Sequence, residues 1–205
     1  MEDGLQPVLA LVEAVHELDR EVSVDSSIVR AHQHAHAAVP AARPRPRWAV
    51  GSCGGPTTRI HLACDGHGPP LSIVLSGGNV NDCTQFTQVM AGIAFRRPRP
   101  GRPATRPSRV IADKGYSTKV IRTHLRKRGI PATIPERRDQ QSNRKRKGGA
   151  GGRTPAFDRT AYTRRNAVGR CFNKLKQFRA IATRFDKTAT SYRGMLDLAT
   201  LLIWL

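Results

Sequence analysis

Acidic residues, aromatic residues and cysteines are all scarce in this chain of 205 residues. Asp and Glu number 15 against 35 Lys and Arg, so the formal net charge is +20 and the pI is near 11.3. A surface with this excess attracts polyanions, because each phosphate that it neutralises releases a counterion. Aromatic residues make up only 5% of the chain, which argues against base stacking as the main mode of binding.

Long hydrophobic runs are also missing. A membrane-spanning helix needs roughly 20 apolar residues, and the final stretch LDLATLLIWL is about half that length. The N-terminus MEDGLQPVLALVEAV opens with acids and lacks the basic region of a signal peptide. The four cysteines contain no CxxC pair, which argues against a zinc ribbon or a disulfide framework: Cys53, Cys64, Cys83 and Cys171. We therefore expect a cytoplasmic protein with reduced thiols and no membrane partner.

The order of the hydrophobic patterns predicts an α/β protein with a mixed sheet flanked by helices. The length favours a single domain, 1–205. Strands are expected at 21–30, 59–65, 70–76, 109–113 and 130–134, and helices at 8–18, 81–93, 117–128 and from 158 onward, with a loop at 39–56. In the first strand Asp25 alternates with apolar residues and should project from the polar face of a half-exposed strand. Asp113 follows a continuous apolar run and should lie at the carboxyl end of a buried strand.

Two polar segments have open interpretations. Residues 137–154 are basic, Gly-rich and almost free of apolar side chains, so they should be disordered without a partner. Within them the run of cations either binds phosphates without sequence preference or is a solvated linker: Arg144, Lys145, Arg146 and Lys147. The alternating His32, His34 and His36 would point the same way on a strand, which makes a metal site there a minor alternative.

The stretch AYTRRNAVGRCFNKLKQF predicts a helix with a polar face at the edge of the core. Tyr162, Arg165, Gly169 and Lys176 are separated by three, four and seven residues, which places them within roughly 60° of one another on a helix. An apolar stripe should adjoin that face: Val168, Phe172, Leu175 and Ala182. A site can be built where such a polar face meets the core.

This spacing resembles the Tyr-x2-Arg-x3-Glu-x6-Lys signature of bacterial insertion-sequence transposases of the DDE class. VSVDSSIVRAHQHAH around Asp25 and VIADKGY around Asp113 resemble the first and second Asp motifs of the insertion-sequence-five group, and GGNVNDCTQF is similar to that group as well. With TTRIHLACDG and KTATSY included, the likeness runs from about Asp3 to the last residue. It implies a ribonuclease-H-like fold with the first Asp on the first strand, the second after the fourth strand and a Glu on a late helix.

The resemblance also implies a function, namely metal-dependent nicking of DNA and strand transfer during DNA transposition. Asp25 and Asp113 would ligate Mg²⁺ or Mn²⁺ in a two-metal site, which activates an oxygen nucleophile and stabilises the leaving oxygen. Arg165 and Lys176 would contact DNA phosphates, with Tyr162 and Lys114 beside them. The expected partner is double-stranded DNA, both the transposon ends and the target, inside a bacterial nucleoid.

The sequence departs from the family pattern at two places. Gly169 stands at the Glu position and has no side chain to ligate a metal, so this copy should be impaired unless Asp186 or Glu136 substitutes. The helical region that precedes the first Asp strand in the family is mostly missing, as in a split reading frame or a truncated remnant. The alternative is therefore a non-catalytic DNA-binding remnant or transposition inhibitor, associating with itself or with a full-length transposase. A basic RNA-binding protein of ribosomal type is a further rival that explains only the charge.

Overall fold

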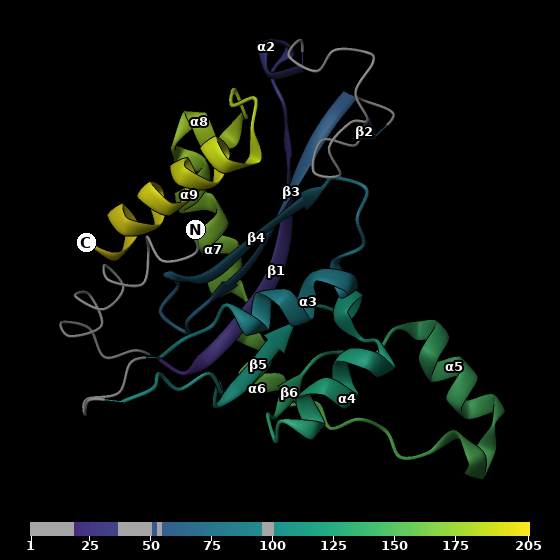
Figure 1. Ribbon diagram of the computed structural model, residues 1–205. Helices are drawn as coiled ribbons and strands as arrows, with labels where there is room; N and C mark the ends of the chain where they lie inside the picture. Colours follow the sequence, from purple (N-terminus) through teal and green to yellow (C-terminus); the bar gives the residue numbers. More distant parts are fainter. Residues whose placement is uncertain (1–18, 37–50, 53–54, 96–100) are drawn as a thin grey trace.

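The computed structural model describes residues 19–36, 51–52, 55–95 and 101–205 of the chain (Figure 1). The helix expected at 8–18 and most of the loop expected at 39–56 lie outside the described residues. So does Cys53.

A mixed six-stranded sheet forms the centre of the fold. Its main path runs β4-β3-β1-β5-β6, with β2 paired to the start of β3. β1 lies in the middle, antiparallel to β3 and parallel to β5. The strands are β1 (Glu21–Arg30), β2 (Gly51–Ser52), β3 (Gly55–Cys64), β4 (Pro70–Gly77), β5 (Arg109–Ala112) and β6 (Ala132–Thr133). All strands expected from the sequence are present. The expected strand at 130–134 is shorter than expected, because β6 contains only Ala132 and Thr133.

Helices cover both faces of the sheet (Figure 1). One hydrophobic cluster joins Val22 and Val24 of β1 to α3 and α4, and the second joins β3 to α7, α8 and α9. The helices are α2 (Gln33–His36), α3 (Asp82–Ala91), α4 (Lys119–Lys127), α5 (Arg138–Arg146), α6 (Arg159–Thr163), α7 (Asn166–Gln177), α8 (Arg179–Ala182) and α9 (Ala189–Trp204), with 3-10 turns η2 (Lys114–Tyr116) and η3 (Gly148–Gly151). Among the described residues, none of these helices has the length and apolar character needed to cross a bilayer.

The prediction that β1 is half-exposed is wrong. Ser23, on the same face of β1 as Asp25, has 2% of its surface exposed because that face is covered by α7. β1 is thus a central strand with both faces packed, and Asp25 becomes accessible only because it lies toward the carboxyl end of the neighbouring β5. The alternation of apolar and polar residues gave the correct faces but the wrong burial.

The basic segment 137–154, which is expected to be disordered without a partner, contains two short regular elements. It forms α5 and η3, and neither element has a buried residue. α5 stands away from the sheet at the edge of the fold (Figure 1). A helix that buries nothing has little beyond its own hydrogen bonds to stabilise it, so the mobility of this segment in solution stays a prediction.

Candidate active site

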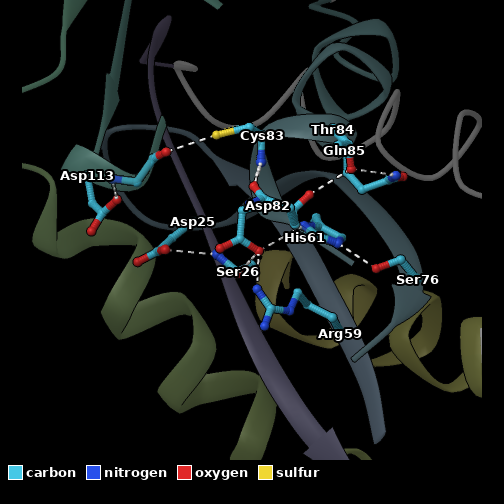
Figure 2. Close-up of polar contacts among 12 residues, drawn as sticks. Asp25, Ser26, Arg59, His61, Ser76, Asp82, Cys83, Thr84, Gln85 and Asp113 are labelled. Atoms are coloured by element: carbon cyan, nitrogen blue, oxygen red, sulfur yellow. Dashed lines mark hydrogen bonds and ion pairs between the residues drawn. The ribbon is translucent and has the colours of Figure 1, made fainter. Parts of the chain in front are cut away.

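Asp25 and Asp113 are neighbours on two adjacent parallel strands. β1 and β5 pair in register up to Val24 and Ala112, and the next residues along the two strands are Asp25 and Asp113. Neighbouring strands lie about 4.8 Å apart. Because both side chains alternate to the α7 face of the sheet, the fold brings together two carboxylates that are far apart in the sequence (Figure 2).

Asp25 is held from two sides. Its Oδ1 accepts a hydrogen bond from the backbone N–H of Ser26 at 2.9 Å, and its Oδ2 accepts one from Nη2 of Arg165 at 2.6 Å. Burial raises the pKa of the Asp25 carboxyl above its ordinary value, the Ser26 N–H and the Arg165 charge oppose that rise, and the charge of Asp113 adds to it. The carboxylate is thus destabilised by its surroundings, as expected of a group that would gain from a bound cation.

Asp113 caps the turn that follows β5. Its Oδ1 accepts from the backbone N–H of Gly115, the middle residue of the 3-10 turn η2. A Cβ at position 115 would lie 2.7 Å from that oxygen, so glycine permits the carboxylate to approach the backbone this closely. Lys114 is exposed beside Asp113. The DKGY motif therefore presents a carboxylate and a lysine at one edge of the sheet.

Helix α7 runs along β1 and supplies the third side of the site. Arg165, at its N-terminus, reaches Asp25, while Nζ of Lys176, near its C-terminus, donates to Oγ of Ser27 at 2.5 Å. Gly169 lies between these two contacts. A Cβ built there would meet only Oδ1 of Asn166, at 3.2 Å, so the space around position 169 admits a larger side chain.

The long helix expected from Asp158 is interrupted. It divides into α6 and α7 at Arg164 and Arg165, where backbone bonds shorten to the i to i−3 pattern. An ion pair that periodicity does not reveal lies at this break: Nε and Nη2 of Arg164 donate to the two oxygens of Glu21 at 2.5 and 2.7 Å. Tyr162 belongs to α6 and packs against Phe157, with ring centroids 5.1 Å apart.

The apolar stripe expected beside the polar face of this helix is confirmed for three of its four residues. Val168, Phe172 and Leu175 are buried in α7. Ala182 instead belongs to α8 and is exposed, because the helix ends at Gln177 and the chain turns. Ile181 is the buried residue of α8.

Neither acid proposed as a substitute for the missing Glu joins the pair. Glu136 forms an ion pair with Arg144 of α5. Asp186 follows Arg184, whose backbone pairs with Ala31 and His32 beyond the far end of β1. Within the described residues, no group of three or more His, Cys, Asp or Glu side chains is arranged to hold a metal ion.

The cations of the basic segment surround a cleft. A hollow of about 450 Å³ lies between α4, α5 and residues 147–155. Its basic lining residues are Lys119, Arg122, Arg126, Arg144, Lys147 and Arg153. The acid in this lining, Glu136, is already paired with Arg144, so the cleft carries a net positive charge. Lys145 and Arg146 extend the exposed basic surface of α5.

Two minor expectations are settled by the local structure. His34 and His36 belong to the short helix α2, not to a strand, so the alternation that suggested a common direction is wrong. Cys64, Cys83 and Cys171 are free thiols. Burial raises the pKa of Cys64 and Cys171, the latter to about 12, so both stay protonated.

A polar network on the opposite face of β1 was not anticipated from the sequence. Asp82 Oδ1 accepts from Oγ of Ser26 at 2.7 Å and from Nη1 of Arg59 at 2.5 Å (Figure 2). Nδ1 of His61 lies 3.7 Å from the same oxygen, and burial lowers the pKa of His61 to about 4, so the ring is neutral at pH 7. Asn81 caps α3, and the side chain of Asp82 contacts β1 and β3 instead.

The fold and the acidic pair agree with the ribonuclease-H-like arrangement that the sequence resemblance implies. The first Asp lies on the first strand, the second directly after β5, and the position of the third acid on the late helix α7. The model of the family "Transposase DDE domain" matches residues 16–204. The chain belongs to this family.

Curated relatives are bacterial insertion-sequence transposases. The chain is 34% identical over 148 residues to a protein described as a transposase for insertion sequence element IS402 of Burkholderia cepacia, a match over 72% of this chain and 63% of that protein. It is 30% identical over 149 residues to one described for IS6501 of Brucella ovis, over 73% of this chain and 98% of the relative. The match thus spans less than two thirds of the first relative. Membership of the insertion-sequence-five group stays a prediction.

Solved structures with a related arrangement are also transposases. A synaptic complex of the piggyBac transposase with hairpin DNA has a TM-score of 0.45 at 10% identity, covering 90% of this chain and 46% of that one. The catalytic domain of the Mos1 mariner transposase has a TM-score of 0.34 at 13% identity, covering 99% and 87%. These values are too low to add to the family assignment, which rests on the sequence relationship.

Proposed function

We propose that this chain is the catalytic domain of an insertion-sequence DNA transposase in which metal-dependent nicking is impaired by Gly169. The observation that supports the proposal is the position of Asp25 and Asp113 on neighbouring strands, with Arg165 at the start of α7 in contact with Asp25 and Gly169 one helical turn farther along. In the family, a carboxylate from this helix completes the set. Here the helix is present and its carboxylate is missing.

The residues present fit a divalent cation in part. Two carboxylates on adjacent strands are hard oxygen ligands of the kind that Mg²⁺ and Mn²⁺ prefer. Asp25 and Asp113 would hold the ion, which when bound supplies an activated oxygen nucleophile and neutralises charge at phosphorus. Losing even an outer partner of a metal ligand costs about 10–100-fold in affinity or activity, so loss of a direct ligand at position 169 costs at least as much.

Arg165 adds a second impediment. Its guanidinium occupies Oδ2 of Asp25, an oxygen that a cation would need. In this chain Arg165 therefore neutralises the acid in place of a metal ion. When DNA arrives, phosphate oxygens offer the guanidinium an alternative partner of matching geometry, and Asp25 is released.

Lys176 and Lys114 flank the acids on either side. Lys176 is fixed by Ser27 at one end of the site, and Lys114 is exposed next to Asp113. We assign both to DNA phosphates near the scissile bond, and the cleft between α4 and α5 to the backbone farther along the duplex. Its exposed cations come from three separate segments, as expected of a surface that follows a polyanion.

The test is nicking of negatively supercoiled plasmid in Mg²⁺ and Mn²⁺ by the natural chain, by Gly169→Glu and by Gly169→Glu with Asp113→Asn. We expect cleavage near background for the first, a metal-dependent rise for the second and loss of that rise for the third. Strong nicking by the natural chain would contradict the impairment, and nicking that ignores Asp113→Asn would contradict the assignment of the acids.

A non-catalytic DNA-binding product is the second candidate, and the missing carboxylate at 169 favours it. Such a protein would occupy transposon or target DNA, or enter an assembly with a complete transposase and poison it. DNA binding by both the natural chain and Gly169→Glu, with nicking by neither, would support this function in place of the first.

A further inference from the structure

The first turn of α3 touches the supports of both acids, although α3 lies on the other face of the sheet. Asn81 caps this turn by accepting from the backbone N–H of Cys83 at 3.0 Å. The cap fixes the two residues that follow it, Asp82 and Cys83. Each of them makes one contact across to the segment that carries an acid (Figure 2).

The first contact leads to Asp25. Oδ1 of Asp82 accepts from the hydroxyl of Ser26 at 2.7 Å, and the backbone N–H of the same Ser26 donates to Oδ1 of Asp25 at 2.9 Å. Since successive side chains of a strand point to opposite faces, Ser26 connects Asp82 on one face with Asp25 on the other. Arg59, at 2.5 Å from Asp82, balances its charge.

The second contact leads to Asp113. Sγ of Cys83 donates to the backbone carbonyl of Gly115 at 2.9 Å, and the N–H of the same Gly115 donates to Oδ1 of Asp113. Burial raises the pKa of the Cys83 thiol, so the sulfur keeps the proton that it donates. Asp82 thus holds Ser26, whose N–H orients Asp25. Cys83, the next residue of the same turn, holds Gly115, whose N–H orients Asp113.

We propose that Asp82 and Cys83 are positioning residues that fix the Asp25 and Asp113 carboxylates for a divalent cation, an inference that rests on the proposed function for the cation itself. Both acids use Oδ1 for the supporting N–H, so Oδ2 is the oxygen that each would offer to an ion, for Asp25 once Arg165 has withdrawn from it. Two like charges on neighbouring strands repel each other, and without these supports the carboxylates would rotate apart. The turn of α3 opposes that rotation from behind the sheet.

A purely structural role is the competing explanation. In that case the contacts of Asp82 and Cys83 only dock α3 on the sheet, and their loss would lower stability without a specific effect on either acid. Thr84 provides a matched control, because its hydroxyl donates to the carbonyl of Asn81 at 2.7 Å in the same turn and it is exposed. Thr84→Ala loosens the turn without touching Ser26 or Gly115.

The experiment compares Ser26→Ala, Cys83→Ala, Cys83→Ser and Thr84→Ala in the full chain, with two readouts. The first is amide hydrogen exchange of Ser26 and Gly115 in the natural background. The second is Mn²⁺ affinity, by titration with Mn²⁺ alone, in the Gly169→Glu background. We expect Cys83→Ala to speed exchange at Gly115 about fivefold, the effect of one hydrogen bond, and to weaken Mn²⁺ binding about 10–100-fold.

The other variants sharpen the comparison. Ser26→Ala should weaken Mn²⁺ binding to the same degree and speed exchange at the Ser26 amide. Cys83→Ser keeps a donor and should recover most of what Cys83→Ala loses, while Thr84→Ala should leave both readouts unchanged. If Ser26→Ala and Cys83→Ala behave like Thr84→Ala in both readouts, the positioning role is overturned.

The two proposals fail in different ways. If Asp113→Asn does not alter Mn²⁺ binding, or no Mn²⁺ binds, the proposed function fails. The exchange rates at Ser26 and Gly115 then decide alone whether the turn of α3 orients the acids. If Mn²⁺ binds through Asp113 but ignores Ser26→Ala and Cys83→Ala, the positioning role fails and the proposed function stands.

Discussion

Replacing Gly169 by Ala, Gln and Glu distinguishes the effect of a better helix former on stability from the effect of a new carboxylate on metal binding. Gly in a helix interior is less favourable than Ala by about 0.8–1.0 kcal/mol, and Gln and Glu are nearly as good helix formers as Ala. The new Cβ meets only the end of the exposed Asn166 side chain, at 3.2 Å, which can move aside. All three variants should therefore unfold at a temperature roughly 2–4 °C above that of the natural chain, as about 1 kcal/mol gives for a protein of this size.

Only Glu should change metal binding. Its carboxylate lies on the face of α7 between Arg165, which contacts Asp25, and Lys176, which contacts Ser27. It restores a third oxygen ligand, and it also offers Arg165 a partner four residues along the helix, which frees Oδ2 of Asp25. We expect at least about a 10–100-fold gain in Mn²⁺ affinity.

Isothermal titration calorimetry of the four proteins with Mn²⁺, beside thermal unfolding without metal, measures both effects. Gln is the decisive control, because it has the size of Glu without its charge. Equal Mn²⁺ affinity for Glu and Gln would refute the reasoning, since position 169 would then not face the two acids. An Mn²⁺ gain in Gly169→Glu that persists with Asp113→Asn would refute it as well.

Three further predictions follow from charge and burial. DNA binding should be largely indifferent to sequence and fall with a log–log slope of about −0.9 per neutralised phosphate, measured between low and moderate salt; a nearly flat slope would contradict it. Limited proteolysis should cut first within 137–154 and be suppressed by duplex DNA, because this segment buries nothing; cleavage that DNA leaves unchanged would show that the segment does not bind it. Because the pKa of His61 is lowered from 6.5 to about 4, only the unfolded chain takes up its proton between these values, so stability should fall as the pH drops from about 6.5 to about 4. At about 1.4 kcal/mol per pKa unit the free energy of unfolding, measured with urea, should fall by nearly 3 kcal/mol over this range. The His61→Gln variant is the reference, because it should lack this pH-dependent loss of stability.

The parts of the fold that the sequence revealed are those governed by local pattern. The alternation in β1 and the apolar run in β5 each depend on residues within one element. Asp113 could also be predicted as a candidate site residue, because an acid directly after a buried strand lies at the carboxyl end of that strand. The family resemblance then joined Asp25 to Asp113, which no local pattern does.

The features that escaped prediction depend on contacts between distant segments. The break between α6 and α7 accompanies an ion pair from Arg164 to Glu21, 143 residues away. The contacts from Asp82 to Ser26 and from Cys83 to Gly115 span 56 and 32 residues. Nothing near Asp82 in the sequence distinguishes a helix cap from a side chain turned toward β1, so its contact with Ser26 became visible only in the folded chain.

A crystal structure of the Gly169→Glu variant grown with Mn²⁺ is the most direct test of the acidic site. We expect manganese, located by its anomalous scattering, to be coordinated directly by Asp25, Asp113 and the new carboxylate, with Arg165 withdrawn from Asp25. Manganese bound elsewhere, or a Glu side chain directed away from an intact pair of Arg165 and Asp25, would contradict it.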